Sequence, residues 1–133
     1  MNDVLADTHA IIWYLSEPHK LSAKAKQSLM QAEQQGTILI STVTLVELIY
    51  LIERRRVHQN VLEELKDSID NPLEPIDAIP LTVKIAHEME HISRSTVPDM
   101  PDRIIAATAF STGLELVTAD ARIRALTNIK TIW

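Results

Sequence analysis

The sequence predicts a three-layer α/β/α sandwich with a central, mainly parallel sheet. Short apolar runs that end in polar residues alternate along the chain with longer segments whose apolar residues recur at helical spacing. Strands that alternate with helices pair in parallel, because a parallel pair needs a crossover connection. With 133 residues, a 46% hydrophobic content and only 2 Gly, the chain can bury one substantial core, so we expect one domain over residues 1–133.

Composition narrows the classes of function. The chain has no cysteine, which excludes disulfides, thiolate zinc sites and cysteine nucleophiles and fits a reducing compartment. Neither a signal peptide nor an apolar run long enough to cross a bilayer is recognisable, so we expect a cytoplasmic protein that does not associate with membranes. The net charge of −5 argues against nucleic-acid binding by bulk electrostatics, but it allows an enzyme whose acidic site is neutralised by metal.

The first half of the chain contains two apolar strands, each followed by a residue able to cap a helix. The run Val4-Leu5-Ala6 predicts a buried strand that ends at Asp7. A second buried strand is expected over residues 37–41. Between these strands the spacing predicts two helices, over residues 10–15 and over residues 22–35.

The helix after the second strand, over residues 42–53, surrounds one acid with apolar residues. Glu47 is the only charged residue between Ser41 and Glu53. A buried carboxylate is costly unless it is paired, protonated or bound to a metal, so an inward-facing Glu47 needs a partner. The alternative is a glutamate on a narrow solvent-facing strip of the helix. The helix ends in three cations, Arg54, Arg55 and Arg56. They either stay solvated at the negative end of the helix dipole or contact phosphate.

The second half of the chain continues the alternation. Before the central helix, the pattern predicts a helix over residues 57–69, a short strand within residues 74–79 and a helix over residues 81–92. The last of these helices should turn Val83, Ala86, Met89 and Ile92 inward. After the central helix, strands are expected over residues 115–118 and 129–133.

The central helix begins near Pro101 and is apolar or small on every side from Ile104 to Phe110. Met100 precedes a proline, which disfavours helix at that position, and proline is favoured in the first helical turn. We therefore expect a buried helix with Asp102 at its mouth. Taken alone, Asp102 is equally explained as an acid placed against the positive end of the helix dipole.

Four or five carboxylates are expected at one edge of the sheet. Asp7 and Asp120 follow strands, where ligand sites of parallel sheets gather. Glu47 and Asp102 lie on helices that start from that edge, with Asp99 on the entry loop. Such a cluster needs a counter-cation, and oxygen ligands without clustered histidines favour Mg²⁺ or Mn²⁺. Without metal, at least one carboxyl should have a pKa above its unfolded value.

This pattern resembles the PIN-domain ribonucleases, in particular the VapC-like toxins of bacterial toxin–antitoxin pairs. The resemblance spans nearly the whole chain. It rests on four segments: Leu5-Ala6-Asp7-Thr8-His9-Ala10, Thr44-Leu45-Val46-Glu47-Leu48, Pro101-Asp102-Arg103-Ile104-Ile105-Ala106-Ala107-Thr108-Ala109 and Thr118-Ala119-Asp120. The first and third segments are the more specific.

The resemblance implies an endoribonuclease that cleaves RNA with Mg²⁺ or Mn²⁺, as the toxin of a toxin–antitoxin pair. It also implies a homodimer silenced by an antitoxin that reaches the acidic site. Many relatives have a proline directly after the acid matching Asp99, whereas Met100 intervenes here, so Asp99 is either a ligand or a loop cap. Carried over residue by residue, the catalytic and metal-binding acids would be Asp7, Glu47, Asp102 and Asp120, with Thr8 and Thr118 in support.

Two alternative functions remain open. The segment from His87 to His91 matches H-E-x-x-H, in which two histidines on one helical face bind zinc beside a glutamate base, here Glu88, and predicts a zinc metalloprotease. The extended continuation of that motif is absent, so any third ligand would be a later acid. The other alternative is a PIN fold that has become a non-catalytic binding module, whose mark would be loss of the acids; here all four positions retain them.

Aromatic residues mark candidate surfaces for association with a second copy or an antitoxin, because protein interfaces are enriched in them. Core packing is the competing interpretation for each. The candidates are Trp13, Tyr14 and Tyr50.

Overall fold

A computed structural model describes residues 2–133 and contains one sheet of five parallel strands in the order β3-β2-β1-β4-β5. The predicted parallel sheet is therefore confirmed, including the short strand within residues 74–79. The strands are β1 (Val4–Ala6), β2 (Ile38–Ser41), β3 (Ile76–Ile79), β4 (Leu116–Val117) and β5 (Thr131–Ile132).

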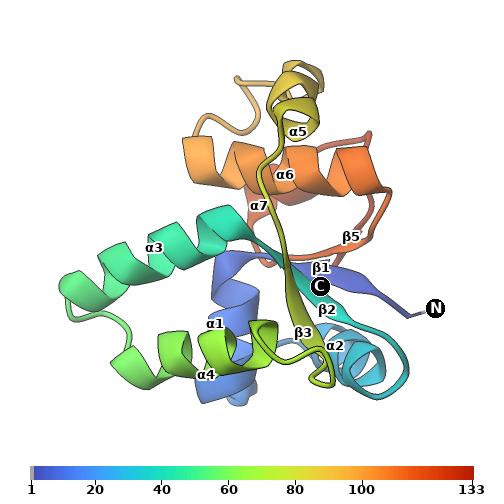
Figure 1. Cartoon of the computed structure of the whole chain (residues 1–133). Helices are drawn as coiled ribbons and strands as arrows, with labels where there is room; N and C mark the ends of the chain where they lie inside the picture. The colour runs from blue at the N-terminus through green and yellow to red at the C-terminus, as the bar shows by residue number, and fades with distance from the viewer. Residues whose placement is uncertain (1) are drawn as a thin grey trace.

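Helices cover both faces of the sheet, which gives the three layers expected from the sequence (Figure 1). One layer holds α1, α2 and α4, the other holds α5, α6 and α7, and α3 projects from the sheet edge between them. Their bounds are α1 (Thr8–Ser16), α2 (Ala23–Gln35), α3 (Thr42–Glu53), α4 (Gln59–Ile69), α5 (Val83–Glu88), α6 (Met100–Thr112) and α7 (Ala121–Arg124), with 3₁₀ helices at Pro18–Lys20 and Met89–His91.

The central strands β1, β2 and β4 are buried on both faces, so their side chains form two separate cores. Val4 and Ala6 pack with α1, α2 and α4, whereas Leu5 packs with α6. This division follows from the two-residue period of a strand. From Ile104 to Ala109 every residue of α6 is buried, which confirms the predicted central helix. Gly113 ends it with φ of 74°, a left-handed conformation that glycine adopts without strain.

The segment over residues 81–92 differs from the prediction. Helix α5 ends at Glu88 and a 3₁₀ turn follows, and the buried residues are Ile85 and Ile92, whereas Val83 is 74% exposed. Within α5 itself Ile85 points inward and the predicted inward residues Val83 and Ala86 are exposed, so the inner face differs from the predicted one, and the 3₁₀ turn after Glu88 then brings Ile92 into the core. Arg103 stabilises this turn, since its side chain donates to the carbonyls of Met89 and Ile92, both at 2.9 Å.

The chain topology brings the ends of β1 and β4 together. From β1 the sheet continues to β2 and β3 on one side and to β4 and β5 on the other, so the strand order reverses between β1 and β4. Ala6 pairs with Val117 in the register of these strands. The residues that follow each strand therefore lie side by side, at the position where open parallel sheets bind ligands. No helix within residues 2–133 is long and apolar enough to cross a membrane.

Candidate active site

A cavity of about 500 Å³ lies at this switch point and collects all five carboxylates predicted from the sequence. Its walls come from the start of α1, from α3, from the start of α6 and from the loop after β4. The lining residues are Asp7, Thr8, His9, Trp13, Glu47, Asp99, Asp102, Ala119 and Asp120. The structure thus places Asp7, Glu47, Asp99, Asp102 and Asp120 around one space, although they are up to 113 positions apart in the chain.

Asp7 is buried at the junction of β1 and α1. Its Oδ1 caps α1 by accepting from the Ala10 amide at 2.8 Å, and its Oδ2 accepts from the Thr118 hydroxyl. The same Thr118 oxygen accepts from the Asp120 amide at 3.0 Å. Thr118 therefore fixes the Asp7 carboxylate and, at the same time, the backbone of Asp120.

Glu47 points into the cavity and is held by hydroxyl groups. Thr8 donates to Glu47 Oε1 at 2.6 Å, and the Thr44 hydroxyl lies 3.0 Å from that of Thr8. Since Thr8 has one proton and gives it to Glu47, Thr44 must donate to Thr8. The interpretation of Glu47 as a residue of a solvent-facing strip is therefore wrong, because Glu47 lines the cavity, whereas the exposed residues of α3 are Val46, Ile49, Tyr50 and Glu53.

Two further acids of the site cap helices. Asp99 accepts from the Asp102 amide at 3.2 Å and caps α6, and Asp120 Oδ1 accepts from the amides of Arg122 and Ile123 and caps α7. The cap expected for Asp99 is thus present, and its side chain also lines the cavity. Asp102 differs from these acids, because within residues 2–133 its carboxylate accepts no hydrogen bond.

The electrostatics of the cavity favour uptake of a cation. Burial, followed in order of importance by the charges of the neighbouring acids Asp99, Asp120, Glu47 and Asp7, raises the pKa of Asp102 to about 7. Burial also raises the pKa of Asp7 and of Glu47, against the opposing hydrogen bonds from Thr118 and Thr8. None of the ion pairs found among residues 2–133 includes one of these acids. The predicted elevated pKa is therefore confirmed, and among residues 2–133 no lysine or arginine pairs with these carboxylates.

The donor set fits a hard divalent cation, because every acidic ligand offers oxygen and none offers sulfur. Within residues 2–133, however, no three His, Asp or Glu side chains are already arranged around a common point as ligands. Asp7 and Glu47 are turned towards their threonine donors. Binding of an ion therefore requires rotation of carboxylate side chains, for which Asp102, without a hydrogen-bond partner, is the freest.

Three lining or supporting residues were not found by sequence reasoning. Thr44 lies one helical turn before Glu47, and this spacing, which puts both on one face of α3, was the available signal. His9 and Trp13 lie on the cavity face of α1 at a spacing of four residues, with their rings 5.8 Å apart. Apolar periodicity alone assigns Trp13 to the core.

The H-E-x-x-H segment does not form the arrangement that a zinc protease needs. Helix α5 ends at Glu88, so His87 and His91 do not lie on one face of a regular α-helix. His91 instead stacks on Phe110 at 5.1 Å and lies 3.6 Å from Glu88. Neither histidine lines the carboxylate cavity, and no third ligand joins them within residues 2–133.

Comparison with known proteins agrees with the fold. Ribonuclease VapC22 of Mycobacterium tuberculosis is 28% identical over 135 residues, which covers 100% of both chains. The structure of VapBC2 from Rickettsia felis bound to a DNA fragment from their promoter superimposes with a TM-score of 0.72 at 16% identity, over 97% of this chain and 96% of that one. The structure of DNA-bound VapBC from Salmonella typhimurium superimposes with a TM-score of 0.70 at 20% identity, over 98% of this chain and 97% of that one. A family model for the PIN domain matches residues 4–129, and the chain therefore belongs to the PIN domain family.

Proposed function

We propose that this chain is a single-domain endoribonuclease that hydrolyses RNA phosphodiester bonds with the help of Mg²⁺ or Mn²⁺. The observation that carries the proposal is the cavity in which five carboxylates meet, with no lysine or arginine among its lining residues, at the switch point of the sheet. The full-length similarity to a protein named as a ribonuclease supports the same activity. Asp7, Glu47, Asp102 and Asp120 would hold the metal, and Asp99 would add negative charge at the rim.

A bound divalent ion would neutralise the charge of the phosphodiester and lower the pKa of a water molecule. The chain's own part is positioning. Thr118 holds Asp7, and the pair Thr44 and Thr8 holds Glu47. At neutral pH the Asp102 carboxyl is divided between its protonated and ionised forms, because its pKa is about 7. Asp102 is therefore the group of this site that can give up a proton as a cation enters.

The substrate would be single-stranded or looped RNA. A phosphodiester must reach carboxylates that lie at the bottom of a cavity between α1, α3 and α6. Unpaired strands can splay their bases away from the backbone and enter such a space, whereas the backbone of a duplex is held in place by stacking and pairing. We therefore assign unpaired RNA as the substrate class.

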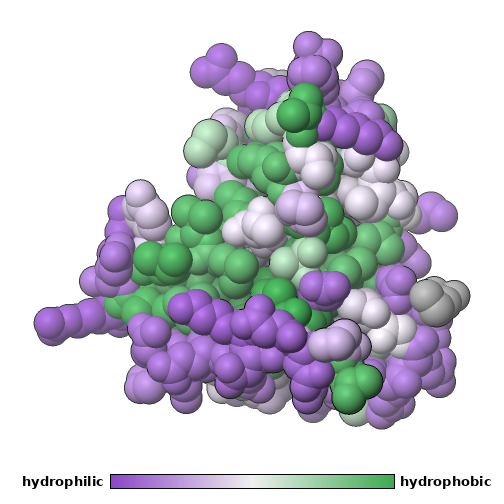
Figure 2. All heavy atoms as spheres, viewed as in Figure 1, coloured by the Kyte–Doolittle hydropathy of each residue, from purple (hydrophilic) through white to green (hydrophobic). Residues whose placement is uncertain are grey.

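We also propose that the chain is the toxin of a toxin–antitoxin pair and forms a homodimer. The similar structures are described as VapBC complexes, and one is named a toxin–antitoxin complex from Klebsiella pneumoniae. Figure 2 shows an apolar area over α3 that is bordered by hydrophilic side chains. On α3 it comprises Val46, Ile49 and Tyr50, which are 53, 44 and 58% exposed. An apolar helix face of this kind fits a protein contact better than solvent. Of the three aromatic candidates, Tyr50 is exposed, whereas Trp13 and Tyr14 pack partly against the core.

The direct test is cleavage of a single-stranded RNA with Mg²⁺ or Mn²⁺ by the wild type, by Asp102→Asn and by Asp67→Asn. Asp67 is an exposed aspartate on α4, outside the cavity, so its variant matches the charge change. We expect Asp102→Asn to lose about 100-fold or more in rate, because one charged ligand is removed while the shape is kept. Chelation of the metal should abolish the wild-type activity. Cleavage by Asp102→Asn at the wild-type rate would refute the assignment.

A further inference from the structure

A second cavity, of about 370 Å³, adjoins the carboxylate cavity. Its lining includes His9 and Trp13, which also line the carboxylate cavity, so the two spaces share a wall. We propose that this second cavity binds one nucleotide of the RNA next to the scissile phosphate. The proposal rests on the ribonuclease function above and adds to it a subsite that recognises the strand.

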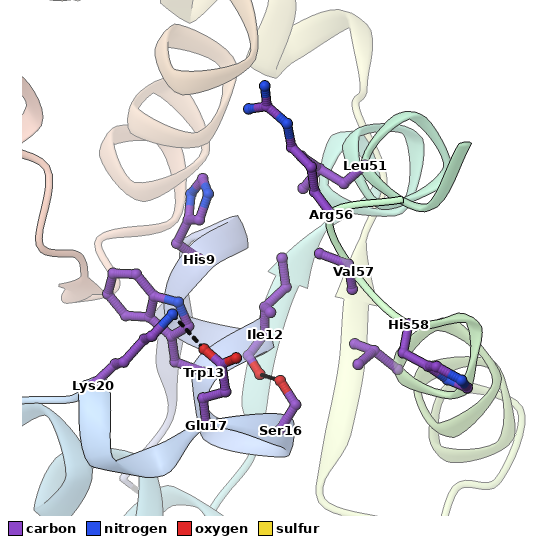
Figure 3. A pocket seen from close by; sticks show the side chains of 11 residues that line it. His9, Ile12, Trp13, Ser16, Glu17, Lys20, Leu51, Arg56, Val57 and His58 are labelled. Atoms are coloured by element: carbon purple, nitrogen blue, oxygen red, sulfur yellow. Dashed lines mark hydrogen bonds and ion pairs between the residues drawn. The ribbon is translucent and has the colours of Figure 1, made fainter. Parts of the chain in front are cut away.

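The walls of the cavity suit a nucleobase. Ile12, Leu51 and Val57 supply an apolar floor. Figure 3 shows His9, Trp13 and Lys20 on one wall and Leu51, Arg56 and Val57 on the facing wall. The indole of Trp13 is held in place by Trp133, whose ring centre lies 5.9 Å away. Fixed aromatic rings beside an apolar floor are the elements on which unpaired bases stack, whatever their identity.

The rim of the cavity suits a phosphate. Lys20 and Arg56 are exposed and come from opposite walls. Lys20 pairs with Glu17 at 2.5 Å, but both side chains are nearly half exposed, and an exposed pair of this kind gives up its partner at little cost. The ammonium of Lys20 also lies 5.9 Å from the Trp13 ring centre. A cation beside an aromatic ring matches the phosphate and base of a single nucleotide.

The backbone places Arg56 at this rim by an unfavourable conformation. Arg55 has φ of 60°, in the left-handed region that glycine usually occupies at the end of a helix. The amides of Arg55 and Arg56 donate to the carbonyls of Ile52 and Leu51, each at 2.9 Å, so the chain reverses out of α3 at this point. The reversal brings Arg56 over the cavity, next to Leu51.

The charge distribution gives the subsite a purpose. The chain carries a net charge of −5, and the carboxylate cavity repels a polyanion until a metal ion occupies it. The adjoining cavity offers two cations and an aromatic wall within one nucleotide of that acidic site. An acidic peptide would use the cations but would leave the aromatic wall and the apolar floor without a matching group. We therefore favour a nucleotide over a peptide.

The test compares two double variants with the same change of charge. Lys20→Gln/Arg56→Gln alters the proposed subsite, and Lys84→Gln/Arg94→Gln alters exposed cations outside both cavities. Binding of a fluorescein-labelled single-stranded RNA is measured by anisotropy over a range of salt concentrations, without metal, and cleavage is measured with Mn²⁺. Loss of two phosphate contacts should lower the slope of log K against log salt by about 1.4 and the affinity by about 25-fold at about 0.1 M salt. The RNA affinity of the control double variant should stay within about twofold of that of the wild type, since the control keeps both phosphate contacts.

A second measurement leaves the protein unchanged. In a series of RNAs, each RNA lacks the base at one different position. Removal of the base at one position beside the cleaved bond should lower affinity for the wild type by about fivefold or more. The same RNA should show no such loss with Trp13→Leu, which removes the aromatic ring while retaining an apolar side chain. In the cleavage assay, the subsite variant should raise KM and leave kcat within about twofold, because its residues lie outside the carboxylate cavity.

The outcomes separate the subsite from the activity. If the wild type binds RNA with the expected difference between the double variants but does not cleave it, the ribonuclease function fails and the subsite stands. If the wild type cleaves RNA and both double variants match it in affinity and salt slope, the subsite is refuted. A loss confined to binding of a protein partner, with RNA affinity unchanged, would refute it as well and assign the cavity to protein docking.

Discussion

Replacing Asp102 by asparagine should make the metal-free protein more stable at alkaline pH. The pKa of Asp102 is about 7 in the folded state, against an ordinary value of 3.8. A carboxyl with a raised folded pKa binds its proton more tightly when folded, so stability is lost as pH rises from about 4 through about 7. Asparagine carries no charge at any pH and is spared this loss.

The magnitude follows from the two pKa values. Their difference corresponds to about 4 kcal/mol of unfolding free energy above pH 7, which solvent screening of a half-buried group reduces to about 2 kcal/mol. For a chain of this length that equals a rise in Tm of roughly 6–10 °C. We expect this rise for Asp102→Asn at about pH 8 and almost none at about pH 4, where the folded wild-type carboxyl is protonated and the unfolded one is only about half ionised.

Thermal melting of the wild type, Asp102→Asn and Asp67→Asn, with and without Mn²⁺, measures the effect. Metal should reverse the order, because an ion at a hundredfold excess over its Kd adds about 2.7 kcal/mol to the wild type. The Asp67→Asn control should follow the wild type throughout. The reasoning is refuted if Asp102→Asn is less stable than the wild type at both pH values and the wild type gains nothing from metal. Asp102 would then serve only as an acid at the start of α6.

Other substitutions test the supports of the site, the turn after α3 and the apolar face. Thr8→Val should lower activity and cost about 1–3 kcal/mol of stability, because Glu47 loses its hydrogen-bond donor. Thr8→Ser, which keeps the hydroxyl, should retain wild-type activity in cleavage assays and wild-type stability in melting assays. Arg55→Gly should exceed Arg55→Val in stability by about 1–2 kcal/mol in denaturant unfolding, since Arg55 has φ of 60°; equal stabilities would contradict the strain. Tyr50→Glu should raise the Kd of a dimer by about 30-fold or more in light scattering, whereas Leu73→Glu, at a site 92% exposed, should not change it. A wild type that stays monomeric at high concentration would refute the proposed dimer.

The sequence predicted those features that depend on local pattern. Strands β1 and β2 are continuous apolar runs, so their ends, and with them the position of Asp7, were placed correctly. Because parallel strands share one carboxyl edge, the position of Asp7 and Asp120 at strand ends was enough to predict that they meet. The burial of α6 followed in the same way from its composition.

Features set by contacts between distant elements were not predictable. The end of α5 at Glu88 and the burial of Ile92 go with the 3₁₀ turn that Arg103 stabilises from 11 and 14 positions away. Helix α7 has four residues, too few for a periodic pattern to indicate it. The role of Thr44 depends on how α1 crosses α3, because only that crossing brings the Thr8 hydroxyl between Thr44 and Glu47.

The site is built from residues that also hold the fold together at the same points. Asp7, Asp99 and Asp120 each cap the helix that begins beside them, and a cap is worth about 1 kcal/mol. This bond draws each carboxylate towards the start of its helix, at the edge where the cavity opens. Capping thus offsets part of the repulsion that gathering like charges creates. Asp102 and Glu47 do not cap helices, and the charge of each is compensated least. A cation bound in the cavity would therefore be expected to gain most of its binding energy from these two acids.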